Sequence, residues 1–139
     1  TQDVPKYSQT DCQMGFVRVC SYGNEKSDTS IAIIGTSTAG QWFDSITSIA
    51  DKNNWHLQIL VREGCTHASG RELTFCNQWR DQVVELVTRE KPDLVIMETS
   101  HATKDETREQ VVKSDQILLK PFAQAGISVI VFYQTKQLT

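Results

Sequence analysis

No hydrophobic run in the 139-residue sequence approaches the roughly 18 consecutive apolar residues that a membrane-spanning helix needs. Charge of one sign is also scarce, since the net charge of −3 is spread along the chain without runs. A nucleic-acid-binding domain usually carries a basic stripe, so we expect no nucleic-acid partner. Residues 1–10 lack the charged start and apolar centre of a signal peptide. We interpret the chain as one domain, either a mature form or a piece of a longer protein.

Cysteine is limited to four residues, and none has C-x₂-C spacing. Four cysteines allow three pairings. We expect Cys12–Cys20 and Cys65–Cys76, because each pair closes a short loop flanked by turn residues. Two alternatives stay open: four buried free thiols, and a zinc site, against which the missing spacing argues. Disulfides persist in oxidising compartments, so we expect an extracytoplasmic protein. We also expect no metal and no cofactor.

Short apolar runs alternate with segments of helical periodicity. Each of the three intervening segments carries one apolar face, as amphipathic helices do. The predicted strands are 31–34, 55–61, 94–97 and 127–132, and the helix faces carry Trp42, Phe43, Ile46, Ile49 and Ala50, then Trp79, Val83, Leu86 and Val87, then Val111, Val112, Leu118, Leu119 and Phe122. The helices should end at Asn53-Asn54, at Lys91-Pro92 and at Gly126, and Pro121 should kink or restart the third.

This alternation predicts an α/β fold in three layers, with a flavodoxin-like parallel sheet in the order 2-1-3-4 and its first strand central. Residues 1–28 would form an irregular, disulfide-bearing N-terminal strap, and residues 29–139 the α/β domain. The sequence ends soon after the fourth strand, where such domains normally add a helix and often a strand. We therefore expect a C-terminally incomplete domain whose fourth strand is an exposed edge, which favours self-association.

The segment 35–42, Gly-Thr-Ser-Thr-Ala-Gly-Gln-Trp, joins the central strand to the first helix. In this segment Ser37 would place its hydroxyl at the carboxyl edge of the sheet, near free N–H groups of the helix N-terminus. These groups and the helix dipole favour developing negative charge, which makes Ser37 a candidate nucleophile. The alternative is that Ser37 or Thr38 only caps the helix. The segment matches neither a GxSxG elbow nor a phosphate-binding GK[ST] loop.

Residues 34–42, Ile-Gly-Thr-Ser-Thr-Ala-Gly-Gln-Trp, resemble the Gly-Asp-Ser block of SGNH hydrolases, in the extended form typical of SGNH domains fused to acyltransferase-3 membrane proteins of bacteria. Other agreements are Glu-Gly-Cys (63–65), Cys-Asn-Gln-Trp-Arg (76–80), Lys-Pro-Asp-Leu-Val-Ile (91–96) and the position of Cys20. The resemblance spans roughly residues 11–132. It implies O-acetylation of cell-envelope glycans, with a membrane-embedded acyltransferase domain as donor in the same or a partner chain.

The resemblance also implies a mechanism. Ser37 would take the acyl group, a histidine positioned by an aspartate would act as base, and an oxyanion hole would hold the tetrahedral intermediate. The backbone N–H groups of Ser37 and Gly64 would donate to the oxyanion, and Ser100 stands near where many SGNH enzymes place an asparagine donor. Thr36 and Thr38 replace the usual aspartate and histidine beside the serine. The catalytic Asp-x-x-His that the family carries beyond the fourth strand does not occur in this sequence.

Three histidines remain as possible bases. His101 follows the third strand, with Asp105 and Glu106 nearby, and is our candidate. His67 lies between two of the cysteines, and His56 begins a strand, where we expect a surface position.

The leading hypothesis is an extracytoplasmic, membrane-tethered SGNH-like domain that transfers an acyl group, preferably acetyl, to a glycan hydroxyl through Ser37. Whether it is an enzyme depends on an Asp-x-x-His in the full-length protein. The first alternative is a non-catalytic domain that binds glycan or regulates a membrane acyltransferase. The second is a secreted carbohydrate esterase, which transfers the acyl group to water.

Overall fold

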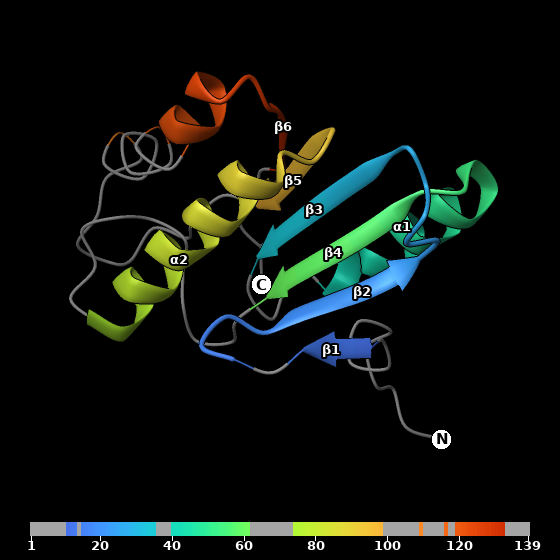
Figure 1. Ribbon diagram of the computed structural model, residues 1–139, viewed down its shortest axis with the longest axis horizontal. Coiled ribbons are helices and arrows are strands. Elements are labelled where there is room, and N and C mark those ends of the chain that lie inside the picture. Colours follow the sequence, from blue (N-terminus) through green and yellow to red (C-terminus); the bar gives the residue numbers. More distant parts are fainter. Residues whose placement is uncertain are drawn as a thin grey trace, which may run out of the picture.

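The computed structural model describes residues 11–13, 15–35, 40–61, 74–98 and 119–132, together with 109 and 116. A mixed, largely parallel sheet lies between helices (Figure 1). Its elements in chain order are β1 (Asp11–Gln13), β2 (Val19–Gly23), β3 (Ser30–Gly35), α1 (Gly40–Asn53), β4 (His56–Val61), α2 (Thr74–Glu90), β5 (Leu94–Glu98), a helix at residues 119–124, and β6 (Ser128–Phe132). In the described part of the chain, no helix is long and apolar enough to cross a membrane.

The six strands lie in the order β1-β2-β4-β3-β5-β6. The four strands β4, β3, β5 and β6 are parallel. They correspond to the four predicted strands in the order 2-1-3-4, with β3 central, so the predicted flavodoxin-like arrangement is confirmed. A buried strand such as β3 carries apolar residues on both faces because helices cover both sides of a parallel sheet, and Ile31 to Gly35 are all buried.

The expectation of an irregular N-terminal strap is wrong for residues 11–23. They form β1 and β2, which pair with each other and join the sheet antiparallel to β4. The physical reason is the period-2 pattern of the segment. Val19 packs toward one core, while Cys20 and Tyr22 pack toward the other. Alternation of this kind places successive side chains on opposite faces of a sheet.

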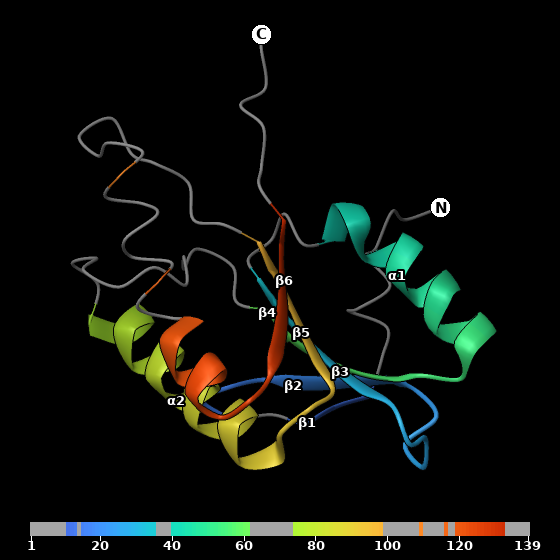
Figure 2. The same cartoon turned by 90° about the horizontal axis from the view of Figure 1, so that it is seen from above.

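Two apolar cores separate the three predicted layers, and Figure 2 shows α1 on one side of the sheet and α2 with helix 119–124 on the other. Trp79, Val83 and Val87 of α2 and Phe122 are buried in the first core, as predicted. Phe43 and Ala50 of α1 are buried in the second.

The predicted face of α1 was wrong at one position. Ile49 is 43% exposed, while Thr47 is completely buried and donates its hydroxyl to the Asp44 carbonyl at 2.8 Å. Because a helix turns about 100° per residue, a face centred on Phe43 and Ala50 contains residue 47 and leaves residue 49 outside it. The hydroxyl is satisfied within the helix, which allows threonine at a core position.

Each of these three helices ends one or two residues before a residue with positive φ, at the predicted positions: Asn54, Lys91 and Gly126. At Gly126 two bonds complete a Schellman motif, Gly126 N–H to Ala123 O at 3.0 Å and Ile127 N–H to Phe122 O at 2.9 Å. Pro121 lies inside helical residues 119–124. Val111, Val112 and Leu118 lie outside the described residues.

Candidate active site

The carboxyl ends of the parallel strands meet at one edge of the sheet. Register pairs Gly35 of β3 with Val61 of β4, and Glu98 of β5 with Phe132 of β6. In open α/β sheets, ligands bind outside the carboxyl ends of the strands, where the strand order reverses direction. Here β3 lies between β4 and β5, so that point is the end of β3.

The predicted catalytic residues follow these strand ends in the sequence. Ser37 comes two positions after the end of β3, Gly64 three positions after β4, and Ser100 and His101 two and three positions after β5. All four lie outside the described residues, as do Thr36, Thr38, His67, Asp105 and Glu106. The structure therefore confirms the elements that flank these residues, and their roles stay predictions.

Helix α1 begins at Gly40, so only residues 36–39 separate it from the central strand. The first turn of α1 contains no acidic residue. An α-helix carries a partial positive charge at its N-terminus, and no carboxylate in this turn offsets it. Negative charge developing near this helix end would be stabilised.

His56 is excluded as a base by its place in the sheet. It is the first residue of β4 and pairs with Ser30, the first residue of β3. The five further residues of β4 separate it from the carboxyl edge, which is about 16 Å away. The predicted surface position is also wrong: the ring is half-buried, and within the described residues its Nε2 is buried without a hydrogen-bond partner. Flanking strands β2 and β3 enclose the position.

Tyr22 and Asp51 tie the antiparallel strand β2 to α1. The Tyr22 hydroxyl lies 3.0 and 3.1 Å from the two carboxylate oxygens of Asp51. Burial, followed by the hydrogen bond to Asp51 and its negative charge, raises the pKa of Tyr22 above its ordinary value. Since Tyr22 pairs with Leu57, near the start of β4, this pair lies away from the carboxyl edge. Its role is structural.

The predicted disulfide Cys12–Cys20 is confirmed, and it joins residues directly opposite each other on β1 and β2. Cys65 and the side chain of Cys76 lie outside the description, so the second disulfide stays a prediction. Among the described side chains, no group of three or more His, Cys, Asp or Glu could hold a metal ion.

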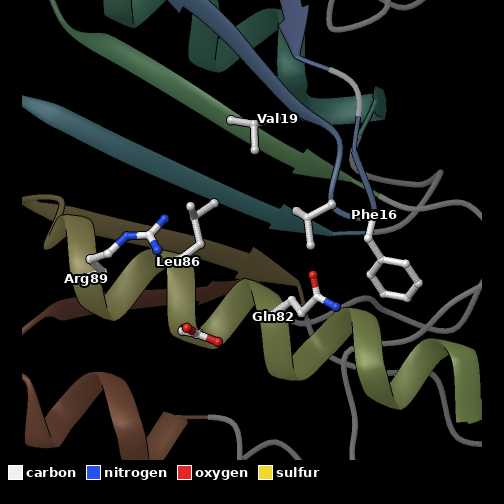
Figure 3. A pocket seen from close by; sticks show the side chains of 7 residues that line it. Phe16, Val19, Gln82, Leu86 and Arg89 are labelled. Carbon is white, nitrogen blue, oxygen red and sulfur yellow. The ribbon is translucent and has the colours of Figure 1, made fainter.

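A pocket of about 460 Å³ lies between α2 and the segment that leads into β2 (Figure 3). Its lining includes Phe16 and Val19 on one side and Gln82, Leu86 and Arg89 on the other. No pattern in the sequence predicted this pocket. Residues 82, 85, 86 and 89 recur at intervals that place them on one face of a helix, so this wall of the pocket could have been predicted. The facing wall comes from Phe16, Val17 and Val19, in a segment that we expected to be irregular.

The fold and the position of the serine-bearing segment define an α/β domain whose candidate site lies at the carboxyl end of a central strand. A protein-family model, "SGNH domain (fused to AT3 domains)", matches residues 6–137. The chain belongs to this family, as the resemblance indicated. Comparison with curated proteins and with solved structures found no match.

Proposed function

We propose that this chain is the SGNH domain of a bacterial envelope O-acyltransferase, and that it transfers an acetyl group to a glycan hydroxyl through Ser37. The family model supports an association with a membrane acyltransferase domain. The single observation that carries the catalytic part is the position of Ser37, two residues beyond the central strand β3 and three before α1. Such a position brings a hydroxyl to the edge where these folds bind ligands.

The proposed reaction has two halves. In the first, Ser37 Oγ attacks the acyl carbonyl, its proton passes to a histidine, and the donor leaves with that proton as its bond to the acyl carbon breaks. In the second, a glycan hydroxyl attacks the acyl-serine, the histidine takes the hydroxyl proton, and Ser37 recovers a proton as the ester bond to Oγ breaks. Backbone N–H groups of Ser37 and Gly64 hold the oxyanion in both halves. His101 is the candidate base within this chain.

A serine-reactive fluorophosphonate tests the first half without knowledge of the donor. We expect intact mass spectrometry to show one adduct on the wild type and none on Ser37→Ala. Ser45→Ala is the matched control, because Ser45 is exposed on α1, eight residues along the chain, and should leave labelling unchanged. His101→Ala should abolish labelling if His101 is the base. An absence of labelling on the wild type would overturn the proposal that this chain contains an activated serine.

The second candidate function is non-catalytic binding of glycan or regulation of the acyltransferase. Thr36 and Thr38 favour it, because neither residue supplies the carboxylate or imidazole found beside the serine in active members of the family. A glycan that binds while the serine stays unlabelled would support this alternative. A secreted esterase shares the site, and release of acetate to water in preference to an offered sugar would identify it.

We also propose an extracytoplasmic location, with attachment to the membrane through the acyltransferase domain. The disulfide Cys12–Cys20 supports it, since such bonds persist in oxidising compartments. We further propose that two copies of the chain associate through strand β6. In the described sheet β6 is the last strand, and its Ile130 is 47% exposed. Fractionation of producing cells would test the location, and a cytoplasmic, fully reduced protein would overturn it.

A further inference from the structure

The pocket beside α2 combines an apolar floor with a polar rim. Phe16, Val19 and Leu86 contribute apolar surface, and the Phe16 residue is 37% exposed. Figure 3 shows Leu86 and Val19 extending from opposite walls into the space between helix and strand. A half-exposed aromatic ring next to aliphatic side chains offers a surface for the C–H faces of a flat, partly apolar ligand.

The rim comes from one face of α2. Gln82, Glu85 and Arg89 lie at intervals of three and four residues, which places them in a row along the helix. The row extends over seven residue steps, or about 10 Å of helix axis, which is the length of roughly two hexose units. An amide, a carboxylate and a guanidinium together offer both donors and acceptors for hydroxyl groups.

The charge on the rim selects among ligand classes. Glu85 and Arg89 carry opposite formal charges and Gln82 carries none, so the row has no net charge. A phosphate or polyanionic ligand would meet the Glu85 carboxylate, and a lipid tail would contact the apolar floor without using the polar row. A neutral, hydroxyl-rich ligand with apolar faces fits both the floor and the rim.

One end of the pocket lies level with the carboxyl edge of the sheet, the edge where Ser37 is expected. In the antiparallel β2–β4 ladder Cys20 pairs with Ile59, so Val19 lies level with the end of β4. Phe16 precedes Val19 by three residues in the sequence. Helix α2 runs back from this edge toward Lys91 and the start of β5, so Gln82 is nearer the edge than Arg89. A polymer lying in the pocket could continue to the carboxyl edge.

We propose that this pocket is a binding subsite for a neutral oligosaccharide, which holds sugar units next to the one that is acylated. The inference rests on the proposed function, because it supplies the acceptor of that reaction. Phe16 stacks on a sugar face, and Gln82, Glu85 and Arg89 bind hydroxyl groups. The subsite takes no part in the reaction at Ser37. It increases the affinity for the oligosaccharide and fixes which sugar unit lies at the serine.

The test is an NMR titration of the ¹⁵N-labelled chain with maltotriose, cellotriose and chitotriose, each to about 20 mM, which detects dissociation constants in the millimolar range. We expect at least one trisaccharide to shift amide resonances of residues 15–19 and 82–89. Phe16→Ala and Arg89→Ala should each weaken that binding about tenfold, equivalent to roughly 1.4 kcal/mol. The controls are Ile49→Ala and Glu90→Ala, which remove an exposed apolar and an exposed charged side chain elsewhere.

The absence of shifts at residues 15–19 and 82–89 with all three sugars would overturn the inference. Equal binding by the wild type and Phe16→Ala would overturn it as well. Ser37→Ala separates this inference from the proposed function: it should bind the trisaccharide normally while losing the fluorophosphonate adduct. Conversely, Phe16→Ala should keep the adduct, because the small probe does not need the subsite.

Discussion

The two lateral edges of the sheet are built differently. At one edge, β1 and β2 are joined by the disulfide Cys12–Cys20, and Tyr22 links β2 to α1. At the other, β6 alternates half-buried and exposed residues, with Ile130 exposed. An unprotected edge strand is a template for pairing with another chain. We call the first edge, where cross-links within the chain hold β1 and β2 in place, the closed edge. We call the second edge, where the outermost described strand exposes an apolar side chain, the open edge.

The closed edge depends most on the close approach of β2 to β4. Gly23 has φ +90°, and a Cβ at this position would collide with the backbone carbonyl oxygen of Trp55. We expect Gly23→Ala to lower the free energy of unfolding by about 3 kcal/mol, from backbone strain plus the clash with atoms that cannot move aside. Urea denaturation measures the change.

Gly126→Ala is the matched control for this prediction. Gly126 also has positive φ, +75°, but a Cβ there meets no atom within 4 Å. Only the cost of placing a residue with a Cβ in the left-handed region remains, which is about 1 kcal/mol. Equal losses in the two variants would show that the approach of β2 to Trp55 does not hold this edge.

The disulfide should have the next largest effect. In the chain-entropy model, a bridge between residues eight positions apart stabilises the folded state by about 2.5 kcal/mol. We expect the double variant Cys12→Ala, Cys20→Ala to lose this amount in urea denaturation. Addition of a reductant to the wild type should cause a loss at least as large. A denaturation midpoint equal to that of the wild type would show that β1 contributes nothing measurable to the closed edge.

The sequence predicted the inner part of this sheet and failed at the closed edge, for a physical reason. Strands β3 and β5 carry continuous apolar runs, such as Ile31 to Ile34, because both of their faces are buried. Strand β2 carries the weaker period-2 signal, and its pairing with β4 is a non-local contact that no local pattern encodes. The candidate site and the pocket also differ in whether a local sequence pattern could predict them. Ser37 was found from its place after a strand, whereas the Phe16 pocket depends on two segments separated by more than 60 residues in the sequence.

Tyr22 gives the closed edge a dependence on pH. Its raised pKa means that the folded state holds the phenolic proton more tightly than the unfolded state does. The contribution is complete below the ordinary tyrosine pKa of about 10 and is lost as pH rises through the folded-state value. We expect Tyr22→Phe to lose about 0.5–1 kcal/mol at pH 8, since the hydrogen bond to Asp51 is exposed.

Denaturation at several pH values isolates this contribution. Between about pH 9 and 11, the wild type should lose more stability than Tyr22→Phe, because the variant has no proton to lose at this position. Asp51→Asn should reduce the loss only in part, since burial is the largest cause of the shift. Identical pH profiles for the wild type and Tyr22→Phe would contradict the proposed coupling.

The smallest effect on stability, and the sharpest test of the comparison, is expected at the open edge. Ile130→Lys should change the free energy of unfolding by no more than about 0.5 kcal/mol, because the residue is half-exposed. A charge on an edge strand opposes pairing with another chain, so we expect Ile130→Lys to abolish self-association in sedimentation velocity. The control is Ile49→Lys on α1, which has a similar exposed fraction and should leave self-association intact. A wild type that sediments as a monomer at all concentrations would contradict the proposed self-association through β6, and the two edges would then not differ in their tendency to pair with another chain.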